Sequence, residues 1–119
     1  MVAIYITDRA ALEIDGIEKY SRKQWGKRVA DEYINNIEKA LELLKEAPGL
    51  LLPKPDFSKH LKFYSTGKRT LVFEVIGDYI YLVTIKYSGM NLEERMTELE
   101  PTLRKEVEIM HFRVLELKK

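Results

Sequence analysis

Apolar residues recur at helical spacing in two stretches of the first half of the chain. Thr7 or Asp8 supplies an N-cap oxygen for the first stretch, residues 8–24, and Trp25-Gly26 ends it, since glycine is free to adopt a left-handed conformation. Pro48 ends the second stretch, residues 27–47. The short link predicts an antiparallel helix hairpin, with Trp25 anchoring the two helices. The two apolar stripes are Ala10, Ala11, Ile14, Ile17 and Tyr20, and then Ala30, Tyr33, Ile34, Ile37, Leu41 and Leu44.

Strand-like runs, rich in β-branched and aromatic residues, lie on both sides of this hairpin. One run opens the chain at residues 2–6, and three follow the hairpin at 61–64, 70–76 and 79–87. Gly77-Asp78 between the last two is a two-residue hairpin signal. Residues 50–58 carry Pro53 and Pro55 and are expected to form an extended loop. The order predicts an α+β fold: an antiparallel sheet of three to four strands, the N-terminal strand being the fourth, with the helix hairpin on one face.

The character of the chain changes after Ser88-Gly89, where a second amphipathic helical pattern begins. Pro101 divides it into expected segments at 91–99 and 101–117, although residues 109–117 also alternate weakly, as a strand does. The apolar stripe must be buried on the sheet, against a second copy of the chain, or in a groove that a partner helix would otherwise occupy. We expect a domain at 1–90 and a helical extension of it at 91–119. The stripe consists of Leu92, Met96, Leu99, Leu103, Val107, Met110, Val114 and Leu117.

Composition limits the chemistry that this fold can carry and the compartment in which we expect it. The 119 residues are 45% hydrophobic and 33% charged, which is typical of one globular domain. There is no cysteine, so disulfides, thiolate metal sites and cysteine nucleophiles are excluded. The N-terminus does not resemble a signal peptide and no run is long enough to span a bilayer, so we expect a cytoplasmic protein without a membrane partner. The two histidines, His60 and His111, have no metal-ligand spacing, and no glycine-rich phosphate loop is present. No metal or cofactor is expected.

Strong nucleic-acid binders usually carry a clear excess of positive charge, and a net charge of +1 does not indicate one. The distribution is uneven, however, because acidic residues gather in the C-terminal segment and basic residues in the middle of the chain. A basic surface of this kind either faces an anionic partner or is simply solvated. The basic residues in question are Lys54, Lys59, Lys62, Lys68 and Arg69.

The order of strand, two helices and three strands resembles the RelE/ParE toxin superfamily, and the local sequence is closer to its ParE branch. The resemblance covers about residues 2–90 and consists of spaced, mostly structural positions. Two departures stand out: Lys86-Tyr87-Ser88-Gly89 replaces a basic pair at the end of the last strand, and the segment 91–119 is longer than the usual tail. The resemblance is carried by Thr7, Ala11, Ile14, Ile17, Tyr20, Trp25-Gly26, Ala30, Tyr33, Leu41, Leu44, Pro48, Leu61, Tyr64, Arg69, Phe73, Asp78 and Ile80.

The resemblance implies the toxin of a type II toxin–antitoxin system, of the plasmid-stabilisation type, neutralised by a cognate antitoxin. ParE-like members inhibit DNA gyrase, whereas RelE-like members are metal-independent endonucleases that cleave mRNA on the ribosome. A repurposed, non-toxic interaction domain is a third reading. The near-neutral charge and the missing basic pair favour the first or third reading over the nuclease. A homodimer is also possible as the oligomeric state.

Candidate site residues differ between these readings. A nuclease needs cations at the phosphate, for which guanidinium has the best geometry, and an acid or base. Binding of a target or antitoxin would use basic residues of the middle and apolar residues of the tail. The nuclease candidates are Arg69, Lys62, Lys86, Tyr87 and His60, and the binding candidates are Lys59, Arg69, Leu92, Met96, Leu99 and Leu103.

Overall fold

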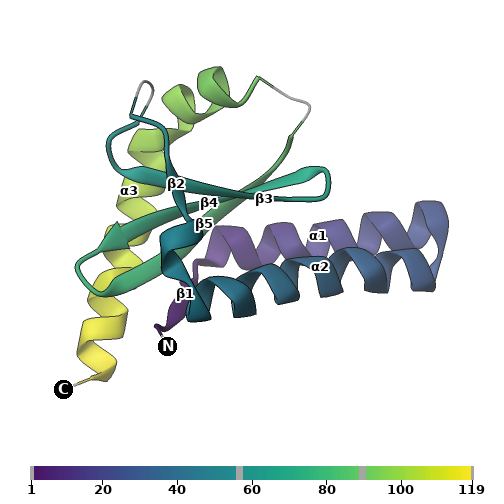
Figure 1. Cartoon of the computed structure of the whole chain (residues 1–119), viewed down its shortest axis with the longest axis horizontal. Coiled ribbons are helices and arrows are strands. Elements are labelled where there is room, and N and C mark those ends of the chain that lie inside the picture. The colour runs from purple at the N-terminus through teal and green to yellow at the C-terminus, as the bar shows by residue number, and fades with distance from the viewer. Residues whose placement is uncertain (1, 56–57, 89–90, 119) are drawn as a thin grey trace.

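The computed structural model describes residues 2–55, 58–88 and 91–118 (Figure 1). The predicted helix hairpin and the α+β class are confirmed. Gly89, in the turn expected after the last strand, and Asp56, in the loop expected at residues 50–58, lie outside the described residues. The elements are β1 (Ile4–Ile6), α1 (Asp8–Trp25), α2 (Lys27–Glu46), a 3-10 helix η1 (Pro48–Leu50), β2 (Leu52–Pro53), β3 (Leu61–Thr66), β4 (Arg69–Ile76), β5 (Tyr79–Tyr87) and α3 (Leu92–Leu117).

The sheet has five strands in the order β1-β5-β4-β3-β2, one more than the upper limit expected. The added strand is β2, in the segment expected to be a loop, where Leu52 pairs with Phe63 and Pro53 with Lys62. Proline is tolerated there because β2 is an edge strand. β1 joins the other edge and runs parallel to β5, with Ile4 opposite Ile80, so the sheet is mixed rather than antiparallel throughout. Parallel neighbours require a long connection, and here α1, α2 and the strands β2 to β4 lie between β1 and β5 in the chain.

Local signals at the two ends of α1 explain how the hairpin is placed. The Thr7 hydroxyl accepts a hydrogen bond from the backbone N–H of Ala10 at 3.3 Å and donates to the carbonyl of Leu82 at 3.1 Å. The cap therefore also fastens the start of α1 to β5. Gly26 has φ +89° and ψ 173°, a region that only glycine enters readily, although it is not the left-handed helical region expected. Helix α2 begins directly after it.

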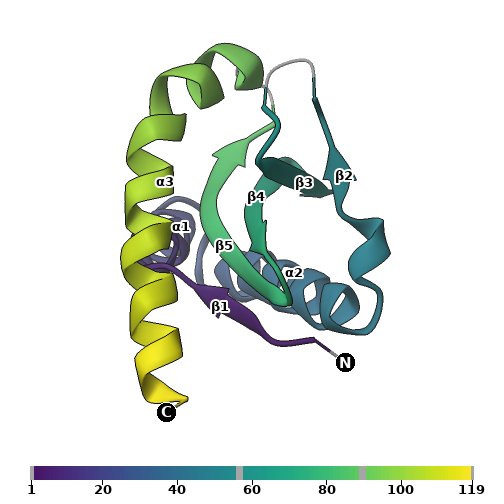
Figure 2. The same cartoon turned by 90° about the vertical axis from the view of Figure 1, so that its left-hand side faces the viewer.

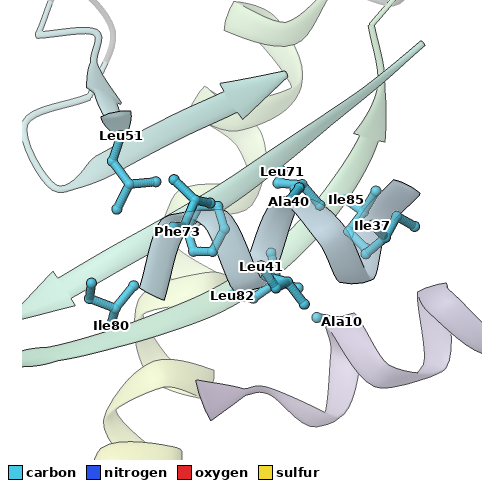
Figure 3. Close-up of a cluster of buried hydrophobic side chains, with 11 residues drawn as sticks. Ala10, Ile37, Ala40, Leu41, Leu51, Leu71, Phe73, Ile80, Leu82 and Ile85 are labelled. Atoms are coloured by element: carbon cyan, nitrogen blue, oxygen red, sulfur yellow. The ribbon is translucent and has the colours of Figure 1, made fainter. Parts of the chain in front are cut away.

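The hairpin packs on one face of the sheet through a continuous apolar core (Figure 3). Leu41 and Ala40 of α2 lie in this core together with Leu71 and Phe73 of β4 and Leu82 of β5. Leu44, Leu71, Phe73 and Leu82 are fully buried. The sheet thus has one face closed by the hairpin, and its second face requires another cover.

Helix α3 is that cover, and it runs along the face opposite the hairpin (Figure 2). Its residues Met96, Leu103 and Val107 are fully buried against Phe63 and Tyr81 of the sheet. The segment therefore folds back on the sheet, the first of the three locations considered, and residues 109–117 are helical rather than extended.

The helix does not break at Pro101, contrary to the expectation of two segments. Proline has no N–H for the carbonyl four residues earlier, so it weakens a helix locally without having to end it. Figures 1 and 2 show the first turns of α3 at an angle to the rest, a bend of the kind that proline produces. Over the described ranges, no helix combines the length and apolar character needed to cross a membrane.

Candidate functional site

A pocket of about 250 Å³ lies where the closed end of the helix hairpin approaches the β3–β4 turn. Trp25 and Tyr33 contribute from the hairpin, and Lys68, Arg69 and Tyr87 contribute from the sheet. A second hollow of about 600 Å³ shares Trp25, Arg69 and Tyr87 with it. We call these five residues, together with Tyr20 of the second hollow, the Trp25–Arg69 surface.

The aromatic half of this surface comes from the helix link. The rings of Tyr20 and Trp25 meet edge to face at a centroid distance of 5.7 Å, and those of Trp25 and Tyr33 do so at 6.1 Å. Trp25 nevertheless stays 54% exposed and Tyr20 56% exposed. The predicted anchoring role of Trp25 is therefore only part of its environment, because more than half of the side chain faces solvent.

The basic half is set by strand register. Arg69, the first residue of β4, lies directly opposite Tyr87, the last residue of β5. The Arg69 guanidinium carbon is 5.4 Å from the centroid of the Tyr87 ring, a cation–π contact. The Ser88 N–H donates to the Lys68 carbonyl at 2.7 Å, which holds the end of β5 against the β3–β4 turn. The Arg69 side chain and a half-exposed tyrosine are thus held together at one end of the sheet, next to the anchored backbone of Lys68.

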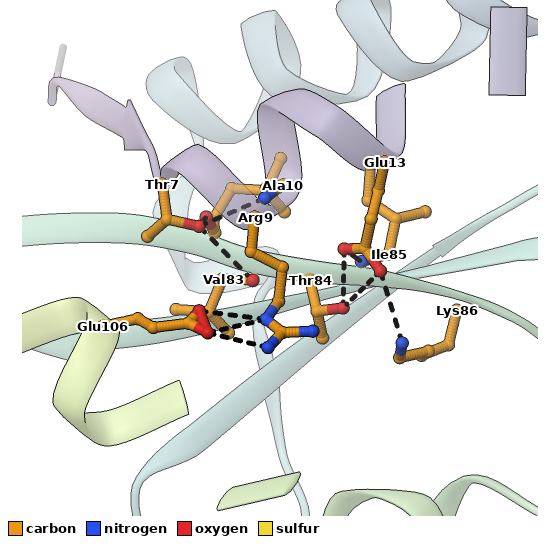
Figure 4. A network of polar contacts seen from close by, with 10 residues as sticks. Thr7, Arg9, Ala10, Glu13, Val83, Thr84, Ile85, Lys86 and Glu106 are labelled. Atoms are coloured by element: carbon orange, nitrogen blue, oxygen red, sulfur yellow. Dashed lines mark hydrogen bonds and ion pairs between the residues drawn. The ribbon is translucent and has the colours of Figure 1, made fainter. Parts of the chain in front are cut away.

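Lys86, next to Tyr87, is held by the fold rather than offered to a ligand (Figure 4). Its ammonium lies 3.3 Å from a Glu13 carboxylate oxygen. The other Glu13 oxygen accepts hydrogen bonds from the Thr84 hydroxyl at 2.7 Å and from the Ile85 N–H at 3.1 Å. The positive charge of Lys86 is therefore largely compensated inside the molecule.

The same close-up shows the Arg9–Glu106 pair, which joins α1 to α3 (Figure 4). The Arg9 guanidinium lies 2.8 Å from the Glu106 carboxylate, and the hydrogen bond to Glu106 raises the pKa of Arg9. This contact fixes the position of α3 relative to the hairpin and leaves both charges compensated.

The remaining nuclease candidates lie elsewhere on the sheet. Arg69 pairs with Thr66, at the far end of β3 from its first residue, Leu61. His60 precedes Leu61, so six residues of strand, roughly 20 Å, separate it from the level of Arg69. Lys59 is exposed beside His60, and Lys62 is the half-buried second residue of β3. The structure therefore brings Arg69 and Tyr87 together but places Lys59, His60 and Lys62 away from them.

The binding candidates in the C-terminal segment face the sheet. Met96 and Leu103 are fully buried, and Leu92 and Leu99 are half-buried beside them. In this conformation they serve as core residues of the α3 layer. Contact of these side chains with a partner would require α3 to leave the sheet.

Two buried polar groups of the α3 layer are further candidates for chemistry. Glu74 of β4 lies 3.0 Å from Arg104 of α3, and burial raises its pKa, with Arg104 acting in the opposite direction. Tyr81 is hydrogen-bonded to Nδ1 of His111, and burial raises the pKa of Tyr81 to about 12. Both groups are enclosed between sheet and helix, so they connect layers. Across residues 2–55, 58–88 and 91–118, no three acidic or histidine side chains gather as a metal site would require.

Arg69 and Tyr87 were predicted from the sequence as candidate site residues, but the aromatic side chains of the helix hairpin beside them were not. Tyr20 and Tyr33 were read as core positions of the two helical stripes, although Tyr20 is mostly exposed. The available signal was Trp25 next to Gly26: a tryptophan in a tight link between two helices has little core to enter.

These features define a small α+β domain with an aromatic and basic surface at one end. Residues 4–92 match the family model described as ParE toxin of type II toxin–antitoxin system, parDE. The chain therefore belongs to the ParE toxin family, and the ParE branch of the resemblance is confirmed. The match ends at Leu92, the first residue of α3, so nearly all of that helix lies beyond it.

The chain is also similar to two known proteins. Toxin ParE1 of Caulobacter vibrioides is 24% identical over 86 residues, covering 72% of this chain and 88% of the relative. A solved structure described as the chromosomal ParDE TA system from P. aeruginosa superposes with a TM-score of 0.64 at 18% identity, covering 73% of this chain and 96% of that one. The structural likeness concerns the fold.

Proposed function

We propose that this protein is a ParE-type toxin that acts in the cytoplasm by binding a protein target, DNA gyrase, and that a cognate antitoxin neutralises it. Membership of the ParE toxin family supports the toxin–antitoxin part of the proposal. The Trp25–Arg69 surface supports the mode of action, because its exposed aromatic and basic side chains suit contact with another protein. It is the observation on which the proposal rests.

The composition of this surface is that of a binding hot spot. Tryptophan, tyrosine and arginine are the residues most enriched at such positions, and side chains that are held in place before binding lose less conformational freedom on association. Trp25 and Tyr87 are 54% and 46% exposed, and the ring contacts and the strand register hold them. Cations at the rim add attraction toward an acidic partner surface.

The arrangement supports the nuclease reading less well. A ribonuclease would need an acid or base next to the cation that stabilises the phosphorane. His60 lies at the other end of β3, and Lys86 is paired with Glu13. Only Tyr87 accompanies Arg69 among the nuclease candidates, and its ring lies against the guanidinium.

The test is induced expression in a bacterial host, scored for growth, DNA supercoiling and mRNA integrity, together with binding of the purified protein to gyrase. We expect growth arrest, relaxed or broken DNA and intact mRNA. Trp25→Ala should weaken gyrase binding by roughly 30-fold, the ~2 kcal/mol of a hot-spot tryptophan. Arg69→Ala should weaken it as well, while Arg28→Ala, whose side chain is 83% exposed on α2, serves as the matched control.

Each alternative has its own signature in the same experiment. Cleaved mRNA with normal supercoiling would move the function to an endonuclease centred on Arg69. Absence of arrest in a susceptible host would leave a non-toxic interaction domain. Loss of gyrase binding in Arg28→Ala but not in Trp25→Ala would refute the role given to the Trp25–Arg69 surface.

A further inference from the structure

Helix α3 has a second apolar stripe, on the side that faces away from the sheet. Ile109 and Phe112 are 56% and 66% exposed, although large apolar side chains are usually covered. Exposed Lys105 and Glu116 continue the stripe, and the steps of four, three and four residues place all four positions on one line along the helix. Lys105, Ile109 and Phe112 also line a shallow hollow of about 480 Å³. We call this line the outer stripe.

The outer stripe is symmetric in position and complementary in charge. Ile109 and Phe112 lie equally far from the midpoint between Met110 and His111, and so do Lys105 and Glu116. A twofold axis through this midpoint would place Ile109 of one copy against Phe112 of the other, and Lys105 against Glu116. Each contact would occur twice, because a twofold interface uses the same surface on both copies.

We propose that the outer stripe binds a second copy of this chain, with the two α3 helices packed antiparallel. The spacing is that of the a and d positions of a helix pair, and antiparallel pairing opposes an a position to a d position. A parallel pair would set Lys105 against Lys105 and Glu116 against Glu116, and both contacts are repulsive. The charges of the stripe therefore select the antiparallel arrangement and disfavour the parallel one.

The neighbouring helix α1 widens the apolar part of this interface. Leu12 of α1 is 72% exposed and shares a hollow of about 500 Å³ with Ile109 and Arg113. A contact of two helices, extended by Leu12, falls at the small end of specific interfaces, so we expect a dimer of roughly micromolar affinity. The surface lies almost entirely beyond residues 4–92, so the match to the ParE family model does not include it.

The test is the molar mass of the whole chain by sedimentation equilibrium or light scattering over a wide range of concentrations. We expect a monomer–dimer equilibrium that Phe112→Glu shifts to monomer at every concentration. The matched control is Leu117→Glu, which adds the same charge at an 86% exposed leucine of α3 outside the outer stripe and leaves the dimer intact. Circular dichroism verifies that both variants are folded.

A charge exchange tests the orientation. Lys105→Glu places two carboxylates together at both ends of the interface and should weaken the dimer at least about tenfold. Lys105→Glu combined with Glu116→Lys restores the opposite charges and should restore the dimer. A wild-type chain that stays monomeric throughout, or a folded Phe112→Glu variant that still dimerises, overturns the proposal. Failure of the double exchange to restore the dimer overturns the antiparallel arrangement.

Discussion

The Glu74–Arg104 ion pair connects the middle of the sheet to α3. Replacement of its α3 partner, Arg104, should lower the free energy of unfolding by an amount that the structure allows us to work out. The side chain of Glu74 is 5% exposed and that of Arg104 is 37% exposed. Within the described residues, the second Glu74 carboxylate oxygen has no hydrogen-bond partner. Arg104→Gln would therefore leave a buried carboxylate without its counter-charge. Loss of one partner costs about 3–5 kcal/mol for a fully buried pair and at most ~1 kcal/mol for an exposed one, so we expect about 2 kcal/mol.

The cost of Arg104→Gln should also depend on pH, in a direction that the pKa of Glu74 determines. Burial raises the pKa of Glu74 above its ordinary value of 4.5, so the folded chain holds the proton more tightly than the unfolded chain. The free energy of unfolding contributed by this group is then highest below the ordinary value and falls as the pH rises through the raised one. Loss of Arg104 raises the folded pKa further. The cost of Arg104→Gln should therefore be small at about pH 4 and reach its full value at about pH 8.

Urea unfolding at both pH values measures this cost, and a double-mutant cycle isolates the pair. In a Glu74→Gln background no carboxylate remains, so Arg104→Gln should cost only about 0.5 kcal/mol and show little pH dependence. Equal costs of Arg104→Gln at the two pH values would refute the reasoning. So would an equal cost in the two backgrounds, because the effect would then come from packing of the arginine stem.

Two further predictions concern the same layer. Leu103→Ala should lower the free energy of unfolding, measured in urea, by about 3 kcal/mol, because Leu103 is a residue of α3 that is fully buried against the sheet. Leu117→Ala, at an 86% exposed site of the same helix, should cost less than about 0.5 kcal/mol. Similar costs for the two variants would show that α3 is not docked. An absorbance titration should detect one tyrosine that ionises near pH 12, well above the ordinary 10.0, and Tyr81→Phe should remove that step; a step that persists would assign it to another phenol.

The sequence predicted the elements with strong periodicity and missed those decided by pairing. Strand β5 was predicted with its observed bounds, and both hairpin helices to within one residue at each end, because their apolar patterns and end signals agree. Strand β2 has two residues, one of them Pro53, so no alternation could reveal it. The parallel direction of β1 depends on which edge of the sheet it reaches, which is a tertiary choice. Pro101 gave a false break because neighbouring packing holds α3 together.

The candidate site could be predicted from the sequence only for the residues that strand register brings together. Arg69 and Tyr87 were both named, and the Gly77-Asp78 turn that sets the β4–β5 register places them opposite each other. Trp25 and Tyr20 could not be assigned to a surface, because helical periodicity alone gives each helix one apolar face and does not show which end of it lacks a cover. The outer stripe was hidden for a similar reason: the stronger inner stripe accounted for the pattern.

The contacts of Glu13 have a consequence for the behaviour of the protein in a crowded solution. Strand β1 covers β5 only from Ile80 to Leu82, so the later part of β5 is the kind of open edge on which foreign strands assemble into aggregates. Glu13 occupies that position, with its carboxylate on the Ile85 N–H and the Thr84 hydroxyl. An incoming strand would have to displace a charged side chain that Lys86 also holds. The Glu13 carboxylate thus blocks the addition of strands from other copies to the β5 edge of the sheet.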